Sequence, residues 1–178
     1  MQKIKLKDKE FAPYIGAEQI ADRIAQLGEK ISADYAGKSP VFLAVLNGSF
    51  MFAADLLREF KGDCHISFVK LASYHGTTST GEVRELIGLN EDIREKDIIV
   101  IEDIVDTGLT VDKVVEALQR LSPASVRIAT LLYKPNAYKG KSEIHYPAIE
   151  IPNDFIVGYG LDYDGLGRNL KDIYKIVE

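Results

Sequence analysis

The sequence contains a single cysteine, Cys64, and no apolar run long enough to cross a membrane. One cysteine excludes an intramolecular disulfide, so the chain does not depend on an oxidising compartment. The N-terminal stretch MQKIKLKDKEF also lacks the continuous apolar segment of a signal peptide. These absences predict a cytoplasmic protein without a membrane span, in which Cys64 packs among apolar neighbours rather than reacting.

Basic residues are outnumbered by acidic ones. The chain has 22 Lys and Arg residues against 27 Asp and Glu residues, which gives a formal net charge of −5 at pH 7. This balance argues against broad attraction to nucleic acid or to an anionic membrane surface, although it leaves room for a local basic patch. The three histidines, His65, His75 and His145, lack metal-ligand spacing, so we expect no zinc site.

Two common phosphate-binding motifs are missing. Gly-Lys-Ser occurs at 37–39 and at 140–142, but the glycine that a Walker A loop needs five residues earlier is Ser32 in one case and Pro135 in the other. The G-x-G-x-x-G pattern of dinucleotide-binding folds follows none of the expected strands. We therefore expect neither kind of site.

The chain does contain a regular alternation of short apolar runs and amphipathic helical stripes. The expected strands are 40–46, 65–72, 97–102, 125–133 and 155–161, and the expected helices are 17–35, 50–60 and 111–121. This alternation predicts an α/β fold with an open, mainly parallel five-stranded sheet and helices on both faces. No linker interrupts the chain, so we expect one domain, residues 1–178, with a small hood lobe formed by segment 1–12 and the tail after 161.

The strand-to-helix segment IVIEDIVDTGLT, residues 99–110, combines two kinds of binding group. Successive N–H groups at the start of a helix form an anion site, which Gly108 opens to close approach and to which Thr107 and Thr110 add hydroxyls. Glu102 and Asp103 lie too far back to touch the same phosphate, but carboxylates accept hydrogen bonds from a diol and attract Mg²⁺. A ligand with a diol at one end and a phosphate at the other is ribose 5-phosphate.

The whole 99–110 string resembles the phosphoribosyl-pyrophosphate loop of the type I phosphoribosyltransferases. That loop consists of an apolar strand, two acids, two apolar residues, Asp and then Thr/Ser-Gly-x-Thr/Ser, and every position here matches it. The resemblance extends over nearly the whole chain, and the branch that the chain is most similar to is the hypoxanthine (hypoxanthine-guanine) phosphoribosyltransferases. It implies a phosphoribosyltransferase domain with that family's α/β fold.

Four further segments carry this resemblance. AVLNGSFMFAADLLR resembles the family's pyrophosphate loop, carried by Asn47, Gly48 and Ser49, although many relatives have lysine where this chain has Asn47. The loop is therefore expected to offer backbone and amide contacts rather than a cation. VKLASYHGTTSTGEV resembles the mobile catalytic loop, with Ser73 and Tyr74 in place. The sequence from 73 to 90 alone leaves a lid and a disordered connector equally open, and the resemblance favours the lid.

The last two segments resemble the purine site. LLYKPNA supplies Lys134, and IEIPNDFIVGYGLDYDGLGRNL supplies Phe155, Ile156, Asp162 and Arg168 at the family's spacing. Read without the resemblance, Lys134 and Arg168 would be surface cations and Phe155 a core residue.

The resemblance implies an enzyme that transfers the 5-phosphoribosyl group from phosphoribosyl pyrophosphate to a 6-oxopurine through an oxocarbenium-like transition state, with Mg²⁺ as cofactor. Asp106 would be the general base that takes the N7 proton, Lys134 would donate to O6 and so reject adenine, and Phe155 would stack on the purine. The implied phosphoribosyl-pyrophosphate site is Asn47, Gly48, Ser73, Tyr74, Glu102, Asp103, Asp106, Thr107, Gly108, Leu109, Thr110 and Arg168. The implied purine site is Lys134, Phe155, Ile156 and Asp162, and the implied metal ligands are Glu102, Asp103 and Asp162.

The implied partners are these small molecules and further copies of the chain, as a homodimer or homotetramer, with no nucleic acid and no membrane. The choice among hypoxanthine, guanine and xanthine stays open. One rival is a phosphatase, because Asp162 and Asp164 form an Asp-x-Asp-Gly motif, but Leu166 follows where that class has Thr. Another is a regulator that binds RNA or DNA and senses a nucleotide at the same loop, which the acidic composition disfavours.

Overall fold

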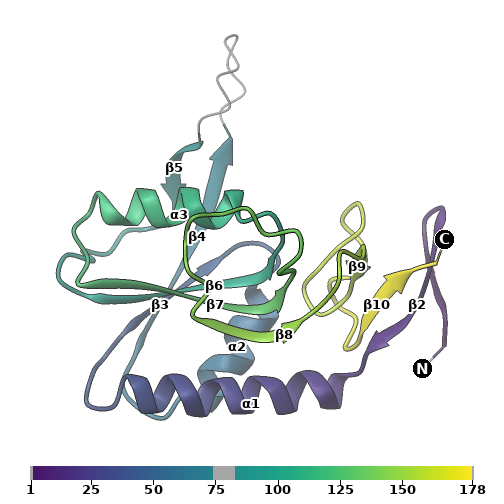
Figure 1. Cartoon of the computed structure of the whole chain (residues 1–178), viewed down its shortest axis with the longest axis horizontal. Helices are drawn as coiled ribbons and strands as arrows, with labels where there is room; N and C mark the ends of the chain where they lie inside the picture. The colour runs from purple at the N-terminus through teal and green to yellow at the C-terminus, as the bar shows by residue number, and fades with distance from the viewer. Residues whose placement is uncertain (1, 74–82, 178) are drawn as a thin grey trace, which may run out of the picture.

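The computed structural model describes residues 2–73 and 83–177, and within them a six-stranded sheet runs through the centre of the molecule (Figure 1). Its strand order is β5-β4-β3-β6-β7-β8. The strands are β3 (Val41–Val45), β4 (His65–Ser73), β5 (Val83–Ile87), β6 (Asp97–Val105), β7 (Ser125–Tyr133) and β8 (Tyr146–Glu150). Only the β4–β5 pair among these neighbours is antiparallel, so the predicted five-stranded parallel sheet is confirmed.

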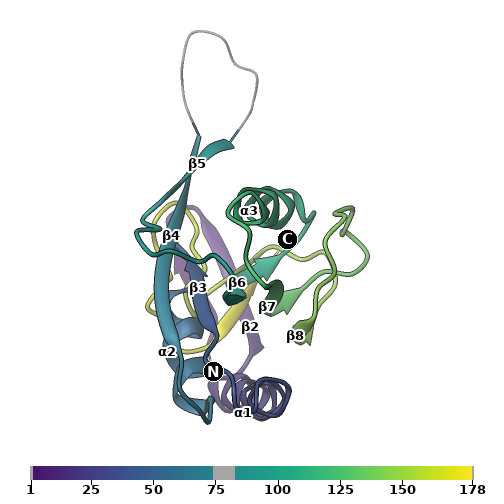
Figure 2. The same cartoon turned by 90° about the vertical axis from the view of Figure 1, so that its left-hand side faces the viewer.

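Helices cover both faces of this sheet, as predicted (Figure 2). Alternate residues of β3 point to opposite faces. Phe42 and Ala44 belong to the core shared with α1 (Ala17–Asp34) and α2 (Phe50–Glu59). Val41 and Leu43 belong to the core shared with α3 (Leu109–Gln119). In the described part of the chain, no helix is both long enough and apolar enough to cross a membrane.

The hood lobe is a second, four-stranded sheet formed from both ends of the described chain, on the right in Figure 1. Its order is β1-β2-β10-β9, and every neighbouring pair is antiparallel. The strands are β1 (Ile4–Leu6), β2 (Lys9–Ile15), β9 (Ile156–Val157) and β10 (Ile173–Ile176). The predicted hood from the N-terminal segment and the C-terminal tail is therefore confirmed.

Some predicted element boundaries are wrong. The fifth parallel strand is β8, not 155–161, of which only Ile156–Val157 is a strand, and it pairs with β10 in the hood. Gly158 and Gly160 have φ of 105° and 98°, which ends the extended run after Val157. β6 also continues to Val105, so Glu102 and Asp103 lie within the strand rather than in the loop after it. Helix α3 ends at Gln119, which leaves Leu121 exposed.

The topology locates a binding crevice without reference to any motif. From β3 the chain crosses through α2 to β4 on one side, whereas from β6 it crosses through α3 to β7 on the other side. Because β3 and β6 are neighbours, the loops that leave their carboxyl ends diverge at this point. Ligands of open α/β sheets bind at such a switch point.

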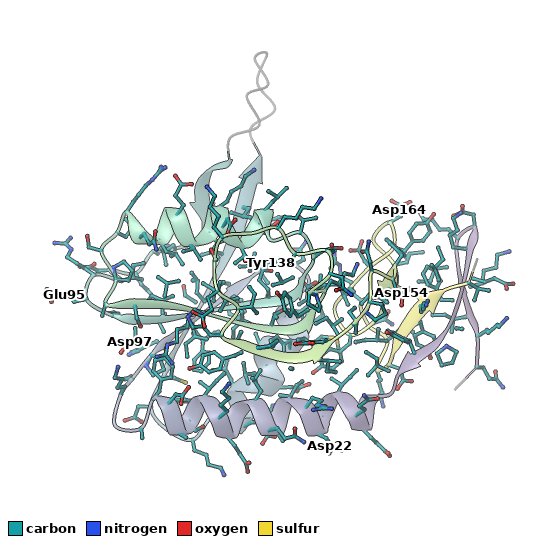
Figure 3. All side chains as sticks on the ribbon, in the orientation of Figure 1. Asp22, Glu95, Asp97, Tyr138, Asp154 and Asp164 are labelled. Carbon is teal, nitrogen blue, oxygen red and sulfur yellow. The ribbon has the colours of Figure 1, made fainter. Side chains whose placement is uncertain are left out.

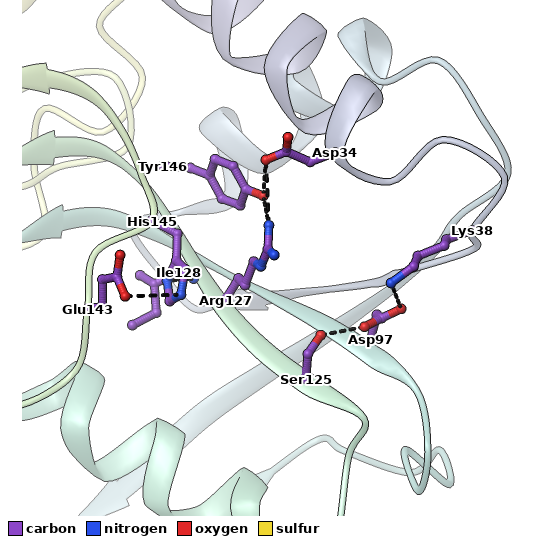
Figure 4. Close-up of polar contacts among 9 residues, drawn as sticks. All are labelled: Asp34, Lys38, Asp97, Ser125, Arg127, Ile128, Glu143, His145 and Tyr146. Atoms are coloured by element: carbon purple, nitrogen blue, oxygen red, sulfur yellow. Dashed lines mark hydrogen bonds and ion pairs between the residues drawn. The ribbon is translucent and has the colours of Figure 1, made fainter.

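A polar network lies at the amino-terminal ends of β6, β7 and β8, which is the end of the sheet opposite the switch point (Figure 4). Tyr146 Oη donates to Asp34 Oδ2 at 2.7 Å, and Arg127 Nη1 donates to Tyr146 Oη at 2.6 Å. These contacts join the end of α1 to β7 and β8. The network is thus part of the scaffold and lies away from the switch point.

Candidate active site

A cavity of about 420 Å³ lies beyond the carboxyl ends of β3 and β6. Its walls come from the loop after β3, the end of β6, the first turn of α3 and the hood. The predicted residues that line it are Asn47, Gly48, Glu102, Asp103, Asp106, Thr107, Gly108, Thr110, Asp162 and Arg168. The structure therefore gathers most of the predicted phosphoribosyl-pyrophosphate site around one cavity at the topological switch point.

Glu102 and Asp103 both line this cavity, where Glu102 is buried and Asp103 is half-buried. Glu102 is 5% exposed, and its Oε1 atom has no hydrogen-bond partner among the residues that the structure describes. Burial, together with the neighbouring charge of Asp103, raises the pKa of Glu102 well above its ordinary range. Burial also raises the pKa of Asp103, although the N–H of Ile104 donates to its Oδ1 at 2.9 Å. A cation or hydroxyl ligand would satisfy these groups.

Glu102 and Asp103 fit a magnesium ion better than a metal held by protein alone. Among the residues that the structure describes, no three His, Cys, Asp or Glu side chains are arranged to hold a metal. Mg²⁺ commonly takes one or two carboxylates and completes its shell with water and phosphate oxygens. The unpartnered Oε1 atom of Glu102 is an oxygen ligand that such a magnesium ion could take.

The hood contributes an ion pair to the cavity wall. Arg168 Nη2 lies 2.6 Å from Asp162 Oδ1, and Arg168 Nη1 donates to Gly160 O at 2.6 Å. Asp162 Oδ2 accepts from the N–H of Gly165 at 2.7 Å. Both predicted ligands thus lie at the site and are held by each other.

The backbone of the loop after β3 lies close against the acids. A Cβ on Gly48 would overlap Asp103 Oδ2, so only glycine fits beside that carboxylate. Ser49 is fully buried, and its Oγ donates to Val45 O at 2.6 Å, which anchors the start of α2. Asn47 lines the cavity from this loop. The peptide bond between Leu46 and Asn47 is cis.

The turn 107–110, which we call the phosphate turn, has the backbone of an anion site. Gly108 adopts φ of 86° and precedes α3, and no side chain caps the helix there. The first N–H groups of α3 are therefore available to a ligand. Leu109 differs from its neighbours, because its side chain is exposed and does not line the cavity. Any contribution from Leu109 would come from its backbone.

A second cavity, of about 200 Å³, opens beside the first. Asp103, Ile104, Asp106 and Asp162 line both cavities, and Lys134, Asp154, Phe155, Ile156 and Leu161 complete the second. The two cavities are therefore neighbouring subsites, with Asp106 at their junction.

Lys134 and Phe155 have unusual exposure for their residue types, because the lysine is buried and the phenylalanine is exposed. Lys134 is 6% exposed, and its Nζ donates to Asp106 Oδ2 at 2.7 Å and to Asn153 Oδ1 at 3.4 Å. Phe155 is 48% exposed, and its ring lies 6.0 Å from that of Tyr163, edge-on. A buried cation and an exposed aromatic face suit a planar polar ligand. Ile156, in contrast, buries its side chain in the core.

Sequence reasoning missed two residues here. Asn153 accepts from Lys134, and its position two residues before Phe155 in IPNDF was the available signal. Lys70, a lone cation in the apolar run of β4, lines the larger cavity. Ser73 is the last residue of β4, whereas Tyr74 and the rest of 74–82 lie outside the described residues. The prediction of a loop over all of 73–90 is wrong in its second half, because Val83–Ile87 form β5, which pairs antiparallel with β4.

The Asp-x-Asp-Gly motif does not form a phosphatase site. Such a motif would follow the first strand of the sheet, but Asp162 and Asp164 lie in a turn of the hood. Asp162 pairs with Arg168, and Asp164 pairs with Lys7 of the β1–β2 turn. Neither carboxylate is placed as a nucleophile at a strand end of the central sheet.

Comparison with known proteins shows which family the chain is similar to. A family model described as phosphoribosyl transferase domain matches residues 15–164. Hypoxanthine-guanine phosphoribosyltransferase of Staphylococcus aureus (strain Mu50) is 44% identical over 157 residues, which cover 88% of each chain.

Solved structures extend the likeness to the fold. A hypoxanthine-guanine phosphoribosyltransferase from Bacillus anthracis, with HEPES in its active site, superposes with a TM-score of 0.85 at 38% identity, over 94% of this chain and 97% of that one. Hypoxanthine phosphoribosyl transferase of Trypanosoma cruzi superposes with a TM-score of 0.85 at 33% identity, over 98% and 95%. Sequence and fold agree over almost the full length, and the chain belongs to the hypoxanthine-guanine phosphoribosyltransferases.

Proposed function

We propose that the protein transfers the 5-phosphoribosyl group of phosphoribosyl pyrophosphate to hypoxanthine and guanine, which yields IMP or GMP and pyrophosphate. The observation that carries this proposal is the position of Asp106, which lines both cavities and accepts from the buried Lys134 at 2.7 Å. A group at that junction can contact the purine while the sugar lies beside it. Family membership supports the same reaction and implies a metal-dependent enzyme.

The larger cavity would hold the phosphoribosyl pyrophosphate. The phosphate turn would bind the 5-phosphate through the N–H groups of α3, and Glu102 and Asp103 would accept hydrogen bonds from the ribose hydroxyls. Mg²⁺, held by Glu102 and Asp103, would neutralise charge on the departing pyrophosphate. Arg168 would add guanidinium hydrogen bonds to that group, in exchange for part of its contact with Asp162.

The smaller cavity would hold the purine against Phe155. Lys134 has three N–H donors, of which two face Asp106 and Asn153, so the third can donate to O6. As the C1′–O bond to pyrophosphate breaks and N9 bonds to C1′, Asp106 accepts the N7 proton on Oδ1, the oxygen that Lys134 does not occupy. Adenine presents an amino group where O6 would be, so two donors would face each other.

The test is nucleotide formation from phosphoribosyl pyrophosphate and Mg²⁺ with hypoxanthine, guanine, xanthine and adenine in parallel. We expect turnover of hypoxanthine and guanine, none of adenine, and a fall in kcat of roughly 10²- to 10⁴-fold in Asp106→Asn. Chelation of the metal should stop the reaction, and Mg²⁺ should restore it. Binding of phosphoribosyl pyrophosphate without turnover of any purine would instead support a nucleotide sensor.

We also propose a cytoplasmic homodimer or homotetramer. The single cysteine is compatible with a reducing compartment. Exposed Phe50, Ile66 and Phe68 lie on α2 and β4 and would suit contact with a second copy. Sedimentation equilibrium of the purified chain would decide the state, and a monomer at micromolar concentration would contradict the proposal.

A further inference from the structure

The loop that follows Lys134 passes behind the phosphate turn. Lys139 N–H donates to Thr107 O at 3.0 Å. The ring of Tyr138, labelled in Figure 3, lies so close to Gly108 that a Cβ on Gly108 would overlap it. Thr107 and Gly108 line the larger cavity, whereas Tyr138 does not. Tyr138 and Lys139, in the loop 134–142, therefore support the phosphate turn from outside the larger cavity.

Asp112 closes this 134–142 loop onto α3. Its carboxylate accepts from the N–H of Lys141 at 2.9 Å, and from the N–H and Oγ of Ser142 at 2.9 Å and 2.7 Å. Burial by itself would raise the pKa of Asp112, but the hydrogen bonds from Ser142 and Lys141 outweigh burial and lower it. The N–H of Asp112 also donates to Gly108 O at 3.0 Å. The Asp112 side chain thus ties the end of the loop to the first turn of α3.

Tyr138 is itself held from several directions. Its N–H donates to Lys134 O at 3.1 Å, and its hydroxyl donates to Ser142 O. Its ring packs edge-on against Tyr133, with 5.6 Å between the ring centroids. Gly140 leaves room for the hydroxyl, because a Cβ there would lie 2.5 Å from Tyr138 Oη. The ring can therefore transmit the position of β7 and the loop to Gly108.

We propose that Tyr138 and Asp112 are positioning residues that hold the phosphate turn in its anion-binding conformation without touching the ligand. Gly108 has no Cβ, so the turn could adopt many conformations if nothing braced it. If an anion site must be ordered on binding, the free energy of ordering is subtracted from the binding free energy, and the affinity falls. The inference rests on the proposed function for its substrate, phosphoribosyl pyrophosphate, while the bracing itself is a property of the free protein.

The kinetic test compares Tyr138→Leu and Asp112→Ala with the wild type. Both variants should raise KM for phosphoribosyl pyrophosphate by roughly 10- to 100-fold, because small displacements of binding groups have effects of that size. KM for hypoxanthine should stay within about twofold, since Asp106 and Asn153 hold the Lys134 side chain and the bond from Tyr138 N–H to Lys134 O is a backbone contact that the substitutions keep. Tyr138→Phe keeps the ring and should lie close to the wild type.

Two variants control for loss of stability alone. Tyr146→Leu removes a buried tyrosine at the opposite edge of the sheet, and Asp92→Ala removes an exposed carboxylate that accepts from Arg94 N–H. Both should leave KM for phosphoribosyl pyrophosphate unchanged, even where the melting temperature falls. A fall in kcat at constant KM in Tyr138→Leu would overturn the proposal.

A second readout does not depend on the reaction. Amide hydrogen exchange at residues 107–111 of the ligand-free protein should be faster in Tyr138→Leu than in the wild type, and unchanged in Tyr146→Leu. If the wild type makes no nucleotide, the proposed function fails, and this exchange measurement still decides whether the loop braces the turn. Equal exchange in Tyr138→Leu and the wild type would overturn the inference.

Discussion

At the scale of single residues, the site is defined by charged groups that are placed where water is scarce. Glu102 and Asp103 are adjacent acids near the end of buried β6, and Lys134 is a buried cation that directly follows β7. Each such group costs stability unless it is paired. Lys134 is paired with Asp106, whereas Glu102 lacks a partner for one oxygen. The unpaired carboxyl of Glu102 should therefore lower the free energy of unfolding of the ligand-free protein by a measurable amount.

Glu102→Gln should stabilise the ligand-free protein at neutral and alkaline pH, by about 1 kcal/mol. Because the folded-state pKa of Glu102 is raised, this carboxyl costs no stability below the ordinary glutamate value of 4.5, and its cost grows as pH rises toward the folded-state value. Melting temperatures of both proteins between pH 4 and 9 would show curves that converge in acid. The variant should lose activity, and a variant less stable than the wild type at pH 8 would contradict the account.

Lys134→Gln should weaken discrimination between purines. The loss of a charged donor to O6 should lower kcat/KM for hypoxanthine by roughly 10- to 100-fold. Adenine, which the wild type should not turn over, should bind more tightly to the variant, because the glutamine carbonyl can accept from its amino group. The ratio of the dissociation constants of hypoxanthine and adenine is the measurement, with Lys38→Gln, an exposed partner of Asp97, as the matched control. An unchanged ratio would mean that Lys134 does not determine which purine the protein prefers.

At the scale of elements, the sequence identifies best those segments whose pattern arises from burial on both faces. β3, β6 and β7 are such strands, and their neighbouring helices show clear stripes. β8 escaped prediction because YPAIE is an edge strand with a proline and only partial burial, so it has no continuous apolar run. Segment 155–161 was assigned to the wrong sheet, because its apolar residues face the core from the hood. Pairing partners are a tertiary property that the pattern does not encode.

Most of the residues named for the candidate site line one of the two cavities. The acids, the phosphate turn and the hood residues are local strings whose chemistry depends on short spacing. Asn153 and Tyr138 were missed because their roles depend on contacts with residues 19 and 30 positions away, Lys134 and Gly108. The burial of Lys134 also had no signal in the sequence apart from the resemblance.

Gly160→Ala tests how the hood meets the loop after β3. Gly160 has φ of 98°, and a Cβ there would overlap Gly48 O. The matched control is Gly37→Ala, since Gly37 has φ of 75° and no atom within 4 Å of the added Cβ. Both variants should lose roughly 1 kcal/mol to backbone strain. Gly160→Ala alone should also raise KM for phosphoribosyl pyrophosphate, by roughly tenfold or more, and equal kinetics in the two variants would contradict this contact.

At the scale of the whole molecule, the hood and the central sheet share one core. Ile15, Ile156 and Ile173 belong to the hood strands, yet they pack in the same cluster as Ile20 of α1 and Phe42 of β3. The Tyr159 hydroxyl donates to Asp55 of α2, which adds a second tie between the hood and the sheet layer. We therefore propose that residues 1–178 act as one phosphoribosyltransferase domain, with the hood as a layer of it.

Ile173→Ala tests whether the hood and the central sheet unfold as one unit. Ile173 is fully buried and pairs with Ile15 across the β10–β2 contact, so the cavity left by alanine should cost about 2–5 kcal/mol. If the hood and the sheet unfold together, this loss should displace one cooperative transition, seen alike by far-UV circular dichroism and tyrosine fluorescence. Ile4→Ala, at the partly buried outer strand of the hood, should cost less but move the same transition. Two separate transitions, with only one moved by Ile173→Ala, would mean that the hood folds independently, and the Arg168–Asp162 wall would then be assembled only when the hood docks.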